Sequence, residues 1–168
     1  ARRRREQGRT TGLEREARDL VQRAERLAEE QRDVAKDVEA LRAGDNRELG
    51  ASTRLMQRKD AMANEVADIE ARLDRMSAEA RREQREASRK LQEAANAIRE
   101  TRLRERILFS KGVVQGGSPE DGRSMVEQIS SSLQAVKNFL SSSEVMKRGS
   151  ERFGIRNFSM LATGLANR

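Results

Sequence analysis

Apolar residues in the first quarter of the chain recur with alternating spacings of four and three, which is typical of a helix that packs in a coiled coil. This pattern predicts a helix from Thr11 to about Ala43, where Gly44 suits a C-cap. Polar Gln31 interrupts the apolar stripe, and such a residue either fixes the register of packing or is simply tolerated. We call this stripe the first seam, and its main members are Leu13, Leu20, Leu27, Val34 and Leu41.

A second stripe begins after a short loop from Gly44 to about Gly50. No proline or glycine occurs from Ser52 to Lys111, so we expect one continuous helix there, about 90 Å long. The length of the loop suits two antiparallel helices, the second folding back along the first. The apolar pattern slips in phase around residues 83–87, which resembles a stutter of about four residues. The second seam comprises Leu55, Met62, Val66, Ile69, Leu73, Met76 and Ala80.

A third helix is predicted to start at Ser118. Pro119 suits the first helical position, and the acidic residues that follow favour the positive end of the helix dipole. The apolar positions of this helix allow it to fold back on the long central helix and close a second hairpin. These positions are Val126, Ile129, Leu133, Val136 and Leu140.

Together the elements predict an all-α fold: elongated antiparallel coiled-coil hairpins that share one long central helix and have flexible ends. We divide the chain into a flexible basic arm (residues 1–10), a first helical hairpin (11–86), a second helical hairpin (87–145) and an apolar and basic docking tail (146–168). Because so thin a shape buries little core per residue, we expect modest stability in isolation and a need for partner surface.

The two ends of the chain carry the residues that we expect to contact partners. The arm holds consecutive arginines, which attract acidic proteins, nucleic acid or anionic lipid; a solvated free end is the simpler interpretation. The tail mixes apolar residues with arginine, and it can pack on the chain's own helices, dock on a partner or lie at a membrane surface. The predicted docking residues are Arg2, Arg3, Arg4, Arg5, Phe153, Ile155, Phe158 and Leu161.

Composition argues against an enzyme. Charged residues make up 38% of the chain and aromatic residues 2%, a balance typical of long helices and coiled coils. The chain contains no Cys and no His, which are common metal ligands and, in the case of His, the commonest general base. Carboxylates are plentiful, but the pattern places them on solvated helix faces, where nothing tunes their pKa. We therefore predict no catalytic residue, no metal site and no cofactor.

One stretch, from about Arg89 to Ile129, contains the segments RKLQEAA (89–95), LRERI (103–107) and SKGVV (110–114), followed by Ser-Pro-Glu. It resembles the C-terminal helical region of some large bacterial envelope proteins of unknown function, which have membrane-spanning segments near their N-termini. The resemblance implies a bacterial envelope setting and a non-enzymatic role. No apolar run in this chain approaches the length of a membrane span. We therefore expect a location peripheral to the membrane, with the cytoplasm as the alternative.

These observations favour a non-enzymatic helical scaffold or accessory subunit that bridges protein partners in a larger assembly, with peripheral contact to a membrane as an option. In one alternative the seams pair between chains, which gives a self-associating coiled-coil protein. In another alternative, the chain is a basic helical nucleic-acid-binding protein, which its net charge of +7 would permit. Arginine alternates with glutamate along the helices and no aromatic residue precedes Phe109, so nucleic acid is the less favoured partner.

Overall fold

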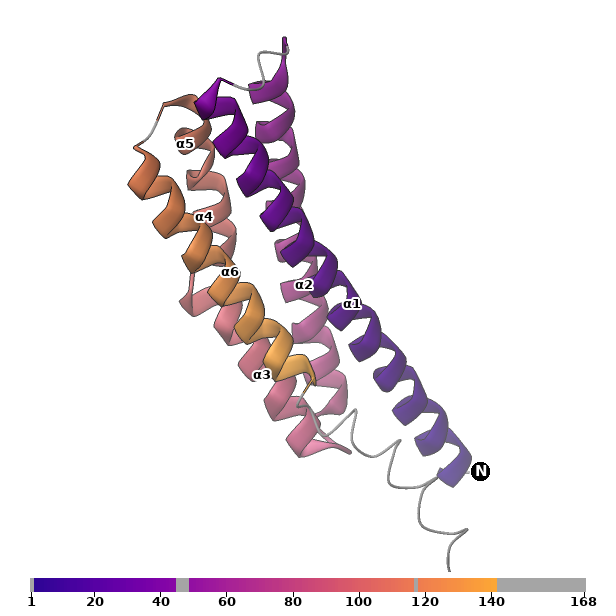
Figure 1. Cartoon of the computed structure of the whole chain (residues 1–168). Coiled ribbons are helices and arrows are strands. Elements are labelled where there is room, and N and C mark those ends of the chain that lie inside the picture. The colour runs from indigo at the N-terminus through magenta and orange to yellow at the C-terminus, as the bar shows by residue number, and fades with distance from the viewer. Residues whose placement is uncertain (1, 45–48, 117, 142–168) are drawn as a thin grey trace, which may run out of the picture.

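The computed structural model describes residues 2–44, 49–116 and 118–141, and nearly all of these residues are helical (Figure 1). No strand occurs in this part of the chain, so the predicted all-α class is confirmed. The helices are α1 (Arg2–Ala43), α2 (Ala51–Ala80), α3 (Arg85–Glu100), α4 (Leu103–Phe109), α5 (Lys111–Gln115) and α6 (Pro119–Ser141).

The helices form four columns that run alternately up and down, which is the arrangement of an antiparallel four-helix bundle. Helix α1 packs against α2 and α6, and α3 packs against the same two helices from the other side. Helices α4 and α5 continue the column that α3 begins, alongside α2 (Figure 1). The predicted second hairpin is thus only part of the arrangement, because α6 also closes the bundle against α1.

A single apolar core lies between the columns, and the seam residues supply most of it. Leu13, Leu20, Leu27 and Val34 are buried, and Leu41 is half-buried against the same core. Helix α2 contributes its buried Val66, Ile69 and Leu73. The opposite columns complete the core with Leu91, Ala94, Ile98, Leu103, Ile107, Ile129, Leu133, Val136 and Leu140.

The prediction of one continuous helix from Ser52 to Lys111 is wrong. The chain reverses at residues 81–84, and α3 returns along α2. Ser77 and Ser88 mark the close approach of these two helices. Ser77 Oγ donates to the Ser88 carbonyl at 3.0 Å, and Ser88 Oγ donates to the Ser77 carbonyl at 2.8 Å. What looked like a stutter is therefore a turn, and its polar residues are outside the core because they lie at the end of the bundle.

A second break separates α3 from α4. Arg102 adopts the left-handed conformation, with φ of 49° and ψ of 44°, which is uncommon for a residue with a side chain. Thr101 Oγ1 donates to the Ala97 carbonyl at 2.6 Å and so satisfies a backbone acceptor at the end of α3. The sequence offered no glycine at this position to signal the break.

The ends of the helices agree with the sequence patterns only in part. Helix α1 ends at Ala43, and Gly44 follows with φ of 76°, as a C-cap glycine should. Ser118 Oγ accepts a hydrogen bond from the Asp121 N–H at 3.2 Å, so the predicted cap of α6 is confirmed. The predicted start at Thr11 is wrong, because α1 already begins at Arg2.

The prediction of a flexible arm is also wrong, because residues 2–10 form the first turns of α1. Arginine, glutamate and glutamine are good helix formers, and a single glycine costs only about 1 kcal/mol, so the helix continues through Gly8. Helix α2 starts after Gly50, which has φ of 83°, rather than at a serine or threonine cap. The docking tail (146–168) and the last residues of the second predicted hairpin lie outside the described residues.

Candidate functional site

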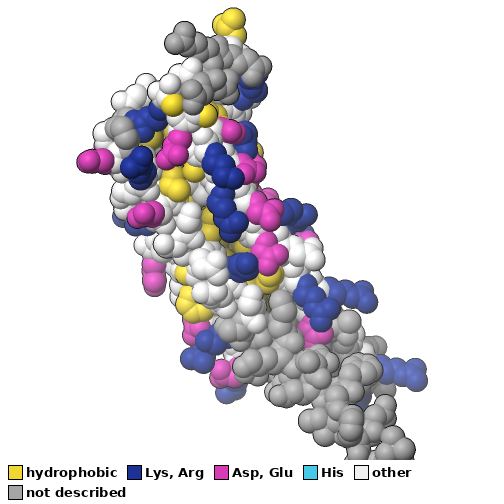
Figure 2. All heavy atoms as spheres, in the orientation of Figure 1, with side chains coloured by type: hydrophobic (Ala, Val, Ile, Leu, Met, Phe, Trp, Pro, Cys, Tyr) yellow, Lys and Arg dark blue, Asp and Glu magenta, His cyan; other side chains and the backbone are white. Residues whose placement is uncertain are grey.

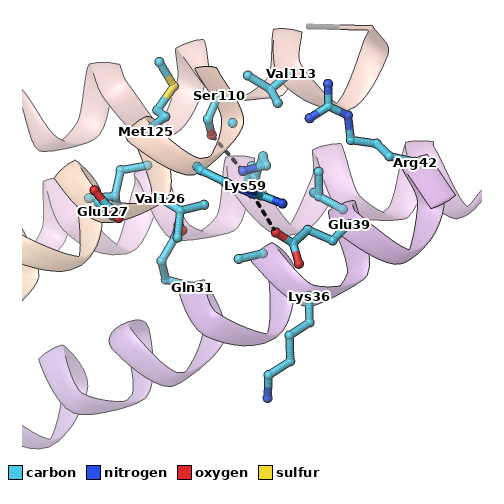
Figure 3. Close-up of a pocket in the computed structure, with 15 residues that line it drawn as sticks. Gln31, Lys36, Glu39, Arg42, Lys59, Ser110, Val113, Met125, Val126 and Glu127 are labelled. Carbon is cyan, nitrogen blue, oxygen red and sulfur yellow. Dashed lines mark hydrogen bonds and ion pairs between the residues drawn. The ribbon is translucent and has the colours of Figure 1, made fainter. Parts of the chain in front are cut away.

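A buried lysine on α2 is the most unusual side chain in the bundle. Lys59 is only 4% exposed, and its Nζ donates a hydrogen bond to Ser110 Oγ at 2.7 Å (Figure 3). The hydroxyl of Ser110 in turn donates a hydrogen bond to the Ile107 carbonyl at 2.6 Å. Burial lowers the pKa of Lys59 from 10.5 to about 8, because a charged amine is poorly solvated inside the protein. The amine is still mostly protonated at neutral pH.

Gln31 faces the interior from α1 and is buried without a partner. Its side chain is 1% exposed, and neither its Nε2 nor its Oε1 has a hydrogen-bond partner among the described residues. Leaving buried polar atoms unpaired costs about 1–3 kcal/mol. The polar residue that interrupts the first seam, Gln31, thus has an unpaired amide in the core, with two N–H donors and one acceptor oxygen.

Both side chains border one cavity of about 480 Å³, a size typical of small-molecule sites. It lies between α1, α2, α6 and the junction of α4 with α5 (Figure 3). A Cβ at Gly122 would come within 3.1 Å of the Val113 side chain, so glycine allows α6 to approach α5 at one end of the cavity. The apolar part of the wall consists of Ala35, Val38, Val113, Met125, Val126 and Ile129.

Charged side chains surround the cavity on its outer side. Glu39 of α1 pairs with Arg123 of α6, whose Nε lies 3.8 Å from Glu39 Oε1. Lys36 points away from the cavity (Figure 3) and lies 3.7 Å from Asp33. With Arg42, Glu127 and the buried Lys59, the lining carries four cationic groups and two carboxylates. The residues that line the cavity therefore carry more positive than negative charge.

This arrangement offers groups that can bind a ligand. The hydrogen-bond partner of Lys59 is a serine hydroxyl rather than a carboxylate, so its positive charge is solvated without being neutralised. Among the described residues, no group of three or more acidic side chains could hold a metal ion. The chemistry that the cavity supports is recognition of an acceptor, above all a negatively charged one.

Ion pairs between columns cover the outer surface of the bundle. Arg23 of α1 reaches Glu65 at 2.6 Å and Asp68 at 2.5 Å on α2, and its hydrogen bond lowers the pKa of Glu65. Figure 2 shows the resulting mixture of basic and acidic side chains on the visible face. Similar bridges join Arg58 to Glu30 and Asp37, and Arg99 to Glu70 and Asp74.

Arg3 and Arg4, two of the predicted docking residues, do not line this cavity. Arg3 and Arg4 are exposed on the first turns of α1, and Arg2 and Arg5 belong to the same turns. The tail residues Phe153, Ile155, Phe158 and Leu161 lie outside the described residues. Sequence reasoning missed Lys59 and Ser110, although Lys59 stands four residues after Leu55 and three before Met62, at a seam position.

No family model matches this chain, and neither a search of curated proteins nor a search of solved structures finds a match. Within the described part of the chain, every helix is too short or too polar to cross a membrane.

Proposed function

We propose that this chain is a non-enzymatic helical scaffold or accessory subunit that bridges protein components of a larger complex. The observation that carries the proposal is the position of the basic turns of α1. Helix α1 begins at Arg2, whereas its first buried described side chain is Leu13. At the rise of an α-helix, about 16 Å therefore separates Arg2 from the first described core residue. We call residues 2–12 the basic extension.

The basic extension is suited to an acidic protein surface. Arg3 and Arg4 are exposed, and a helix presents such residues at fixed spacing, which lowers the entropy cost of binding. Acidic and basic side chains alternate on the face shown in Figure 2, whereas nucleic acid favours an extended basic patch. A protein partner is therefore the better match.

Self-association through the seams has less support. Leu20, Leu27 and Leu73 are buried within the single chain, so pairing them with a second copy would require the bundle to open. A self-associating protein would change size on dilution, whereas a monomeric bundle would keep one size in light scattering after gel filtration.

The cellular setting is part of the proposal. The resemblance of residues 89–129 to bacterial envelope proteins supports an assembly at the bacterial envelope, with this chain peripheral to the membrane. The cytoplasm is the alternative. Cell fractionation distinguishes the two, because a peripheral protein leaves the membrane fraction in high salt when its contacts are electrostatic.

Reversing the charge of the basic extension should remove partners without unfolding the bundle. We expect R3E/R4E to lose the proteins that co-purify with the chain under mild detergent, because a basic surface becomes acidic. The matched control is R15E/R18E, which makes the same change at two exposed positions farther along α1. Mass spectrometry of the recovered proteins measures the result. Equal recovery with both variants would exclude the extension from docking.

Removing residues 150–168 tests the other predicted docking segment. Because the described helices end at Ser141, we expect the truncated chain to keep nearly all of its helical signal in far-UV circular dichroism. We also expect it to lose its partners, since the tail contains the apolar docking residues. Undiminished co-purification would take the tail out of the mechanism, and a large loss of helicity would show that it belongs to the fold instead.

A further inference from the structure

The polar groups at the cavity have unused hydrogen-bonding capacity of a definite kind. Lys59 has three N–H donors, and among the described residues only Ser110 Oγ receives one of them. Gln31 has a free amide group, with two further donors. Two donor groups on facing helices therefore border the same space (Figure 3). The complement of such a pair is a group with two acceptor oxygens.

The charge of the cavity selects among groups with two acceptor oxygens. Lys59 is positively charged at neutral pH, and no carboxylate pairs with it among the described residues. The flanking Glu39 is already paired with Arg123 at the outer edge. An anion would thus replace the solvation that Lys59 loses on burial, whereas a cation would be repelled. A carboxylate meets both requirements, one oxygen for each donor group.

The apolar part of the cavity wall indicates that the rest of the ligand is apolar. Val113, Met125, Val126 and Ile129 face the cavity beside the two polar groups, and Met adapts readily to flexible apolar chains. A volume of about 480 Å³ exceeds what a small inorganic anion would fill, and it lies within the range of pockets for small organic molecules.

We propose that this cavity binds a small amphipathic carboxylate, such as a medium-chain fatty acid, with its head group on Lys59 and Gln31 and its hydrocarbon chain on the apolar wall. Binding satisfies the unpaired amide and neutralises the buried amine in one step. This site is separate from the docking surface proposed above, and the two proposals stand or fall independently.

Decanoate is the probe, with decanol and decyltrimethylammonium as chains of the same length that differ in head group. Isothermal titration calorimetry on the full chain should show one decanoate per chain, bound about tenfold or more tightly than decanol, as one charge-assisted hydrogen bond implies. Decyltrimethylammonium should bind least. Equal affinity for all three probes, or no binding of decanoate, would overturn the proposal.

Three variants locate the binding. K59M should remove the preference for decanoate over decanol, while A35F should block both by filling the cavity. K90M is the control, because Lys90 of α3 is bonded to Glu93 and does not line the cavity, and it should bind like the wild type. Circular dichroism checks that each variant is folded. If decanoate binds folded K59M and A35F as tightly as the wild type, its site is elsewhere and the proposal is wrong.

Discussion

A chain that carries S77C and S88C should form an intramolecular disulfide in air, and the oxidised form should be about 2–3 kcal/mol more stable than the reduced form. The two hydroxyl oxygens are 3.1 Å apart in the structure. In the continuous helix that the sequence suggested, eleven residues would separate the two positions by about 16 Å. Only a chain reversal after α2 brings them into bonding range. Mobility on a non-reducing gel and urea unfolding with and without reductant measure the two effects.

The absence of natural cysteine makes this experiment easy to interpret, because no other thiol competes. The control is S77C/S124C. Ser77 is near the end of α2 and Ser124 is near the start of α6, and these helix ends lie at opposite ends of the bundle (Figure 1). The control pair should stay reduced within one chain. Failure of the Ser77 and Ser88 pair to cross-link in a folded, helical protein would contradict the packing of α3 on α2.

Replacing Lys59 with methionine should stabilise the unliganded protein by about 1–3 kcal/mol at pH 7. Methionine has nearly the length of lysine, and it removes a charge that is only 4% exposed. The fall of the Lys59 pKa from 10.5 to about 8 means that the folded state holds the charged amine less favourably than water does. Ser110 keeps its hydrogen bond to the Ile107 carbonyl, so the variant leaves no hydroxyl proton unpaired.

The gain from K59M should depend on pH in a defined direction. Between about pH 8 and 10.5 the unfolded chain holds the Lys59 proton and the folded chain has released it. Unfolding then takes up a proton, so the stability contributed by this group rises with pH across that window. The wild type should therefore approach K59M in stability as pH rises from 7 to about 10. Urea unfolding of both proteins at several pH values measures this difference, and a constant difference would mean that Lys59 is not buried as described.

The sequence pattern predicted the helical class because helix formers and apolar spacing act locally. It also located the end of α1 at Gly44 and the start of α6 at Ser118, where glycine and a serine cap have a direct conformational role. It failed at residues 81–84 because this turn uses no glycine or proline. A loss of apolar residues fits either a stutter in a long helix or a reversal of the chain, and only the packing of α3 decides between them.

The sequence pattern pointed to only one of the polar residues of the candidate site. Gln31 stood out as a polar residue in the first seam. Lys59 occupies the equivalent kind of position in the second seam, but a lysine usually extends its amine to solvent, so the pattern alone gave no reason to bury it. Ser110 comes from a part of the chain about fifty residues away. The cavity itself depends on how α6 closes against α1, which no local pattern encodes.

The segmented column of α3, α4 and α5 has a mechanical consequence. Its backbone is interrupted at Arg102 and again at Ser110, whereas α1 and α2 run without interruption beside it. Each interruption removes helical hydrogen bonds that would otherwise resist bending. Side-chain bonds to the continuous helix α2 support the column at the second interruption: Lys59 donates to Ser110, and Lys111 pairs with Asp60, each at 2.7 Å. We therefore expect α2 to act as a splint for the segmented column, so that loss of these two bonds would let α4 and α5 bend away from it.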